Sequence, residues 1–189
     1  MRALTLSAAA LLAALATSSA ASAQIAELPG TIQATFRGNA PAGCRMSAGT
    51  VPTSENVQIS ALAPGSADIA INQLVDSNSS PIGATVVLVL PAVCNQAHTL
   101  NLSSVNGGLL GDGPQPTSGP FRSLVPYSVT VNWAGGEQVF VTSDQSLAVP
   151  FGDAAAGFVT VTIQIPEGGA PLTAGTYTDE IVLELGAAG

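Results

Sequence analysis

Apolar and polar residues alternate along most of this chain, which is the pattern of half-buried β-strands. A run that is apolar on both faces, 84–94, is typical of a central strand in a sandwich. The pattern predicts strands at 31–36, 43–50, 56–60, 67–72, 84–94, 98–104, 125–133, 158–166 and 177–185. Turn-rich breaks separate them, and helical periodicity is almost absent after the first residues. Many short strands without helices predict an all-β, immunoglobulin-like antiparallel β-sandwich.

The first 23 residues have the pattern of a secretory signal peptide. Arg2 provides a positive start, the run 3–16 is rich in alanine and leucine, and Ala21-Ser22-Ala23 is a cleavage site of the A-x-A type. The run is too short and too often broken by serine and threonine for a membrane anchor. We expect a mature chain that begins at Gln24 and forms one domain.

The charge of the mature chain excludes some partners. Three arginines and no lysine stand against twelve acidic residues, which gives a formal charge of −9. No basic patch is present for nucleic acid or an anionic membrane. The acidic residues are spread along the chain, which indicates solubility rather than a dedicated acidic site. We therefore expect neither nucleic-acid binding nor membrane insertion.

The two cysteines predict a disulfide. Cys44 and Cys94 form an even pair in a chain expected to be exported, and oxidising compartments favour such bridges. Two cysteines and the single histidine, His98, do not complete a four-ligand zinc site. Closing a loop of this length stabilises a fold by about 4 kcal/mol on the chain-entropy account.

The two ends of the mature chain carry strands that need partners. The alternating strand 177–185 is expected to lie at a sheet edge, and its apolar positions are Tyr177, Ile181, Leu183 and Leu185. The segment 24–42 is expected to form an arm, and its strand 31–36 presents Ile32, Ala34 and Phe36 on one face. Pairing of an extended segment with an exposed edge is β-augmentation, and repeated head-to-tail pairing builds filaments.

Candidate catalytic chemistry is sparse. His98 begins a predicted strand without a nucleophile motif nearby, so we expect a solvent-facing or hydrogen-bonded strand-end histidine. Asp179 and Glu180 are neighbours on a strand and point to opposite faces. The glycine-rich segment 107–113 lacks the ending of a phosphate-binding loop, and a turn explains it better. Trp133, Tyr127 and Tyr177 are expected to pack in the core rather than to bind sugars. We expect no enzymatic activity and no cofactor.

Two stretches together resemble a known family. They are "CNQAHTLNLSSVNGGL", residues 94–109, and "IQIPEGGAPLTAGTYTDEIVLEL", residues 163–185. With the cysteine pair they are similar to the spore coat protein U domain of archaic chaperone-usher (Csu-type) pilins. The resemblance covers about residues 31–185 and assigns 43–189 to this pilin domain.

The resemblance implies a fold, partners and roles for particular residues. It implies an immunoglobulin-like sandwich that lacks its last strand, a periplasmic chaperone, an outer-membrane usher and polymerisation by donor-strand exchange between subunits. It assigns Cys44 and Cys94 to the disulfide. It also assigns two sets of side chains, the donors Ile32, Ala34 and Phe36 and the acceptor-groove residues Ile181, Leu183 and Leu185, to which the strand pattern adds Tyr177.

The function expected from these features is that of a structural subunit in a surface fibre, a fimbrium or pilus, that supports adhesion or biofilm formation. An alternative is a tip subunit or free-standing secreted module that recognises a surface or glycan through its loops. An N-terminal arm on a single domain favours the first hypothesis. A self-completed sheet would favour the second.

Overall fold

The computed structural model describes residues 37–63 and 66–187. The residues from Ala40 onward form one compact unit. The predicted signal peptide and the donor side chains of segment 31–36 lie outside the described residues, so both stay predictions.

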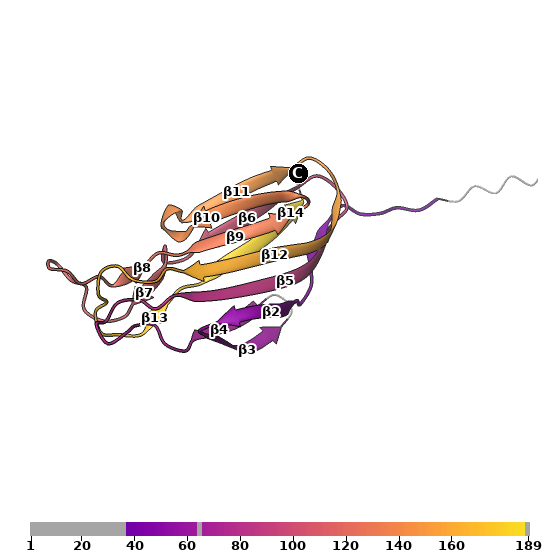
Figure 1. The fold of residues 1–189 in the computed structure, drawn as a ribbon. Coiled ribbons are helices and arrows are strands. Elements are labelled where there is room, and N and C mark those ends of the chain that lie inside the picture. Colours follow the sequence, from indigo (N-terminus) through magenta and orange to yellow (C-terminus); the bar gives the residue numbers. More distant parts are fainter. Residues whose placement is uncertain (1–36, 64–65, 188–189) are drawn as a thin grey trace, which may run out of the picture. The chain divides into compact units, whose positions relative to one another are not determined.

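Two layers of antiparallel strands make up this unit (Figure 1). The broad sheet has the order β1-β5-β12-β9-β10. The strand β2 also pairs with β5, at residues that precede those paired with β1. Its strands are β1 (Cys44–Met46), β2 (Thr50–Glu55), β5 (Ala84–Cys94), β9 (Ser128–Trp133), β10 (Gly136–Val141) and β12 (Ala155–Ile165). The all-β architecture expected from the alternation is confirmed, and it is that of a β-sandwich.

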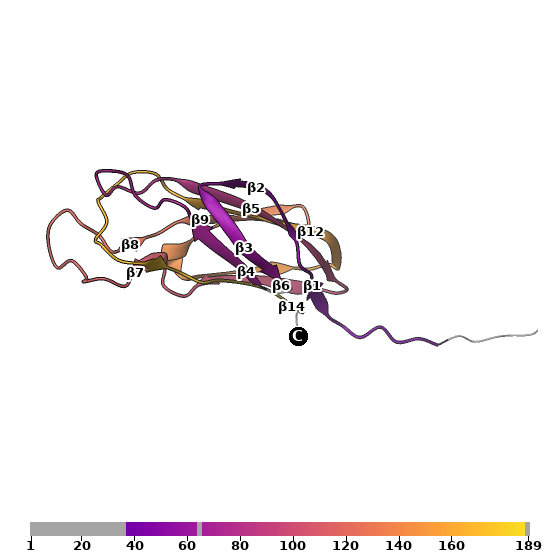
Figure 2. The same cartoon turned by 90° about the horizontal axis from the view of Figure 1, so that it is seen from below.

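The second layer is narrower and is divided into smaller sheets. One has the order β11-β6-β14, another has the order β13-β7-β8, and β3 pairs only with β4. The strands are β3 (Val57–Ala63), β4 (Ser66–Ile71), β6 (His98–Ser104), β7 (Leu109–Gly111), β8 (Leu124–Val125), β11 (Ser146–Phe151), β13 (Tyr177–Thr178) and β14 (Ile181–Ala187). One short 3-10 helix, Thr142–Asp144, joins β10 to β11. Seen from below, the β3–β4 hairpin lies across the side of the sandwich, with β5 and β14 on either side of it (Figure 2).

The core lies between the two layers and is built from alternate residues of the long strands. The five apolar residues that alternate along 125–133 are all buried, namely Val125, Tyr127, Val129, Val131 and Trp133. The other main contributors are Val86 and Leu88 on β5, Val159 and Val161 on β12, and Leu100 and Leu102 on β6. The period of two therefore identifies the inward faces correctly.

Several predicted boundaries are wrong. Strand 177–185 is interrupted after Thr178, because the chain passes there from pairing with β7 to pairing with β6, and the Asp179 carboxylate between the two accepts hydrogen bonds from Ser104 and Asn106. The predicted strand 43–50 ends at Met46. After it the chain crosses β5 so closely that a Cβ on Gly49 would overlap the Val89 carbonyl oxygen. Only glycine fits such an approach.

Some strands of the structure were not predicted from the sequence. The segment 107–113, expected to be a turn, contains the short strand β7. The strand β10 carries no clear alternation, whereas β11 alternates Leu147, Val149 and Phe151 but contains a proline, which disfavours a strand. Both are fixed in place by pairing with β9 and β6. Strand 125–133 is divided into β8 and β9 by Pro126 and Tyr127.

The predicted disulfide is confirmed. Cys44 and Cys94 lie directly opposite each other in the β1–β5 ladder and are bonded. The bridge ties the first strand of the described unit to a long strand of the broad sheet. A disulfide of this kind is typical of proteins that fold in an oxidising compartment.

His98 is buried, so a solvent-facing side chain is excluded and the hydrogen-bonded alternative holds. Its Nε2 accepts a hydrogen bond of 2.8 Å from Nε1 of Trp133, across the two layers. Nδ1 lies 3.0 Å from the Gln96 carbonyl and donates to it, because Nε2 is the acceptor. The imidazole also stacks on Phe151, with the ring centroids 5.1 Å apart. His98 therefore joins the layers as a structural residue.

Replacing His98 tests this link between the layers. In His98→Leu the buried Trp133 N–H loses its acceptor, so we expect the free energy of unfolding to fall by about 1–3 kcal/mol. His98→Gln retains a carbonyl oxygen and should lose less. Denaturant unfolding followed by the fluorescence of Trp133, the single tryptophan, measures both variants. Equal losses would show that the hydrogen bond contributes little.

Candidate functional site

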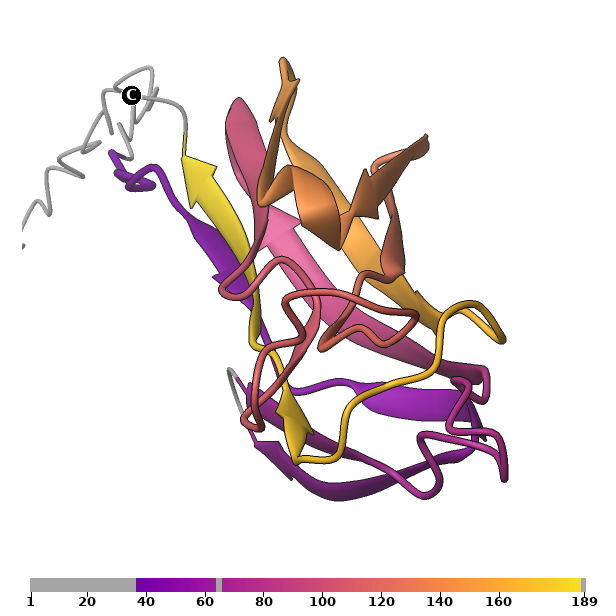
Figure 3. The same ribbon diagram turned by 90° about the vertical axis from the view of Figure 1, so that its left-hand side faces the viewer.

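Strand β14 has a free edge. It pairs with β6 on one side, and among the described residues no strand pairs with its other side. Strand β1 lies beside it, as Figure 3 shows, yet β1 is hydrogen-bonded to β5 in the other layer. Where β1 does not lie against it, the backbone N–H and C=O groups of this edge are therefore available to a further strand.

An apolar groove of about 360 Å³ opens beside this edge. Its floor is the inner face of β5 and β12, one wall is β14, and another is β4 of the hairpin. The apolar lining consists mainly of Val86, Leu88, Leu90, Val161, Ile163 and Ile165 on the floor, Ile181 and Leu183 on β14, and Ile69 and Ile71 on β4. The groove exists because the narrow layer leaves part of the broad sheet uncovered.

The groove residues expected from the sequence are only partly brought together. Ile181 and Leu183 line the groove. Leu185 is half-buried and packs against the core farther along β14, and it is not a lining residue. Tyr177 lies apart from the groove. Its ring covers Gly111, and its hydroxyl donates a 2.8 Å hydrogen bond to the Thr173 carbonyl, four residues earlier.

A hydrogen bond from a tyrosine hydroxyl to the backbone a few residues earlier is known as a tyrosine corner in Greek-key sandwiches. Tyr177 therefore holds the connection into β14 and fixes where that strand begins. The sequence pattern placed it on the groove face because the interruption at Asp179 and Glu180 is not visible in the alternation. The sequence analysis did not assign the residues of the groove floor. The alternation of apolar residues along β12 is the pattern that could have indicated them.

One end of the groove is polar and strongly hydrogen-bonded. The Asp179 carboxylate accepts from the Ser104 hydroxyl at 2.6 Å, the Asn106 amide N–H at 2.9 Å and the Tyr127 hydroxyl at 2.8 Å. Burial, and then the hydrogen bond and charge of Asp179, raise the pKa of Tyr127 well above its usual range. The network joins β6, the segment before β9 and the start of β14, so it fixes this end of the groove.

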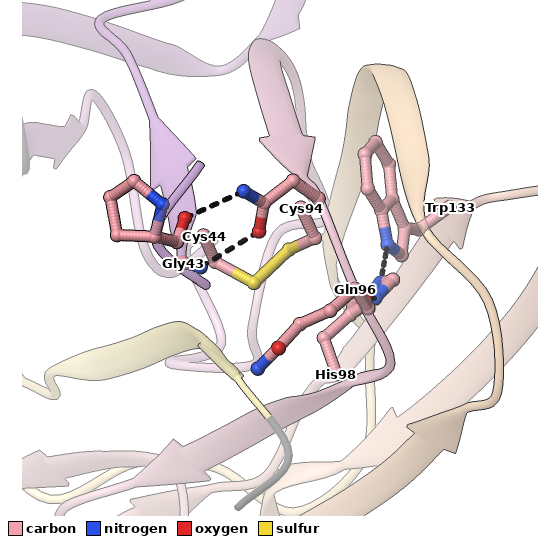
Figure 4. Close-up of a disulfide and its surroundings, with 8 residues drawn as sticks. Gly43, Cys44, Cys94, Gln96, His98 and Trp133 are labelled. Carbon is pink, nitrogen blue, oxygen red and sulfur yellow. Dashed lines mark hydrogen bonds between the residues drawn. A yellow bond between two sulfur atoms is a disulfide. The ribbon is translucent and has the colours of Figure 1, made fainter. Parts of the chain in front are cut away.

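The base of the arm is held by a second set of contacts, drawn in Figure 4 around the disulfide. The side chain of Asn95 accepts from the Gly43 amide at 2.8 Å and donates to the Pro41 carbonyl at 2.7 Å. The backbone N–H of Asn95 donates to the Gly43 carbonyl at 3.1 Å. One asparagine therefore clamps the backbone directly before β1, and the disulfide follows at the next residue.

The arrangement is suited to binding a strand. His98 and Asp179, the candidates for acid–base chemistry, are engaged in structural hydrogen bonds. Within residues 37–63 and 66–187, no three His, Cys, Asp or Glu side chains gather where they could hold a metal ion. The same part of the chain contains no helix with the length and hydropathy needed to cross a membrane.

These features define an all-β sandwich protein with an apolar groove beside an unpaired strand edge. No family model, no curated protein and no solved structure matches the chain.

The raised pKa of Tyr127 gives a pH dependence with a defined sign. The folded state favours the neutral phenol of Tyr127. The stability that this phenol contributes is fully present below about pH 10, the ordinary pKa of tyrosine, and is lost as the pH rises above it. We expect the Tyr127 tyrosinate to appear together with unfolding. The measurement is an alkaline titration followed by tyrosinate absorbance and by circular dichroism. The Tyr127→Phe variant should lose this component, and titration of Tyr127 in a folded protein near pH 10 would contradict the assignment.

Proposed function

We propose that this protein is a structural pilin subunit that polymerises by donating a strand to its neighbour. In this proposal its immunoglobulin-like sandwich is incomplete, and a strand from a second copy completes it. The observation that carries the proposal is the unpaired edge of β14 along an apolar groove. Such an edge is a liability in an isolated protein and a binding site in a polymer.

The occupant that we propose for the groove is segment 31–36 of another subunit. A six-residue strand is about 20 Å long, which is close to the length of the seven-residue β14. The segment is uncharged, and Ile32, Ala34 and Phe36 on one face are suited to the apolar floor. One backbone edge of the segment can form hydrogen bonds with β14 while these side chains enter the groove.

The position of the segment in the chain favours a neighbouring subunit as the acceptor. Seven residues separate Phe36 from Cys44, and they reach about 25 Å when extended. The Asn95 contacts and the disulfide hold the start of β1 and therefore hold the base of the arm. In the proposal, the donor strand continues from this fixed base to an acceptor on a neighbouring subunit.

The partners and location belong to the same proposal. A groove of this kind exposes apolar surface before assembly, so a periplasmic chaperone would cover it and an outer-membrane usher would exchange the chaperone for the next subunit. The disulfide agrees with passage through an oxidising compartment. The product would be a fimbrium on the cell surface that supports adhesion or biofilm formation.

Removal of the arm tests the donor role. We expect the mature chain to form multimers that resist detergent and dissociate on heating, and deletion of 24–37 to abolish them. Unheated and heated samples on denaturing gels provide the measurement. Wild-type-like multimers from the deleted chain would overturn the donor assignment.

A charge placed in the groove tests the acceptor role. Leu183→Asp puts a carboxylate on the groove wall and should reduce multimer formation strongly, because burial of an unpaired charge is costly. Val182→Asp is the matched control, since the neighbouring residue points to the opposite face of β14 and does not line the groove. Equal multimer yields from the two variants would argue against the groove.

A further inference from the structure

Strand β14 turns the backbone groups of alternate residues to its free edge. The backbone N–H of Val105 donates to the Glu180 carbonyl, which continues the ladder between β6 and β14 by one residue. The backbone groups of successive residues point to opposite sides of a strand, so those of Ile181, Leu183 and Leu185 point to the free edge. The three apolar positions of β14 are therefore the positions that can form hydrogen bonds with an added strand.

One register matches the donor segment to these three positions. The argument rests on the proposed function, in which segment 31–36 of another subunit pairs with β14. In an antiparallel pairing its three apolar residues stand opposite three apolar residues: Phe36 opposite Ile181, Ala34 opposite Leu183 and Ile32 opposite Leu185. A shift by one residue turns the donor side chains out of the groove. A shift by two places Phe36 opposite Asp179 or leaves Ile181 without an apolar partner.

The same register brings two opposite charges together. Arg37 follows the donor segment directly, and it is the only basic residue of the arm 24–42. It would stand opposite Glu180, which is exposed and lines the groove. Because the Glu180 carbonyl points to β6, this would be a non-hydrogen-bonded pair, in which the two Cα atoms are about 4.5 Å apart and the side chains lie closest. In the described part of the chain, neither side chain forms a hydrogen bond or an ion pair.

Charge also favours the antiparallel direction over the parallel one. A donor parallel to β14 would carry Arg37 to the end of β14 at Ala187, the end that pairs with the start of β6. Strand β1 lies beside β14 and contains Arg45, so two cations would approach each other there. The acceptor's own arm also enters β1 at this end, because Cys44 pairs with the last residue of β5. An antiparallel donor leaves the groove at the opposite end.

We propose that Arg37 of one subunit forms an ion pair with Glu180 of the next, and that this pair selects the direction and register of the donor strand. Apolar contacts in the groove supply most of the affinity. A cross-strand pair of opposite charges adds up to about fivefold. A slip of two residues separates the charges by about 7 Å along the strand and loses this contribution. The pair therefore discriminates between registers that bury similar side chains.

Cysteine cross-linking of the full mature chain measures the register. Thr35→Cys combined with Val182→Cys places two thiols on directly opposite residues of a non-hydrogen-bonded pair, where the Cα spacing suits a disulfide. We expect multimers that survive heating without reductant and dissociate when reductant is added. Thr35→Cys combined with Glu184→Cys is the matched control, two residues out of register, and should cross-link weakly. Equal or stronger linkage in the control would overturn the proposed register.

Charge exchange tests the ion pair itself. Arg37→Glu and Glu180→Arg each place like charges opposite each other and should lower the yield of detergent-resistant multimers about fivefold. The variant with both substitutions restores opposite charges and should recover the yield. Glu184→Arg is the matched control, because it makes the same change on β14 opposite Gln33, and Arg37→Glu should not improve its yield. High salt should narrow the difference between the wild type and Arg37→Glu.

The outcomes separate this inference from the proposed function. A wild-type chain that forms no multimers would overturn strand donation, and the ion pair with it. Multimers that depend on the arm but form equally well in both single charge variants would overturn the ion pair alone. Failure of the combined variant to recover the yield would have the same meaning.

Discussion

The ladder between β5 and β12 is the interaction on which the remaining elements depend. It pairs eleven residues of each strand without a break, from Ala84 opposite Ile165 to Cys94 opposite Ala155. Strands β1 and β2 attach to the free side of β5, and β9 attaches to β12. The same two strands supply the floor of the groove, so one pair of strands positions the proposed strand-binding site.

The unequal widths of the two layers explain why the sandwich has an open side. The narrow layer covers the β9 and β10 side of the broad sheet, where His98 and Trp133 connect the layers. On the β5 side the hairpin β3–β4 lies over the core without pairing to either large sheet. In the proposed assembly, the free edge of β14 and the uncovered floor belong to one strand position, which a strand from another subunit would occupy.

Much of the fold follows from local patterns, and the rest depends on pairing over long distances. The bounds of β5 and β6 agree with the sequence prediction, because β6 alternates without interruption and β5 is one apolar run between turn-rich breaks. On β10 the apolar Val139 and Val141 face solvent while Phe140 faces the core, so no period of two is visible. Ile181 and Leu183 were assigned to the groove from the family resemblance, at positions that alternation places on one face, whereas the place of Tyr177 depends on Thr173 and Gly111. Contacts of that kind leave no periodic signal.

The bond between Cys44 and Cys94 also determines how the protein would respond to mechanical force. It joins the first residue of β1 to the last residue of β5, and the Asn95 contacts hold Gly43 and Pro41 shortly before it. Tension applied through the preceding chain therefore passes by a covalent route into β5 and does not peel the three-residue β1 from its partner. The load is then carried as shear by the long ladder of β5 and β12, whose hydrogen bonds resist together. Force applied at this end would therefore reach the longest ladder of the broad sheet without first unpairing β1.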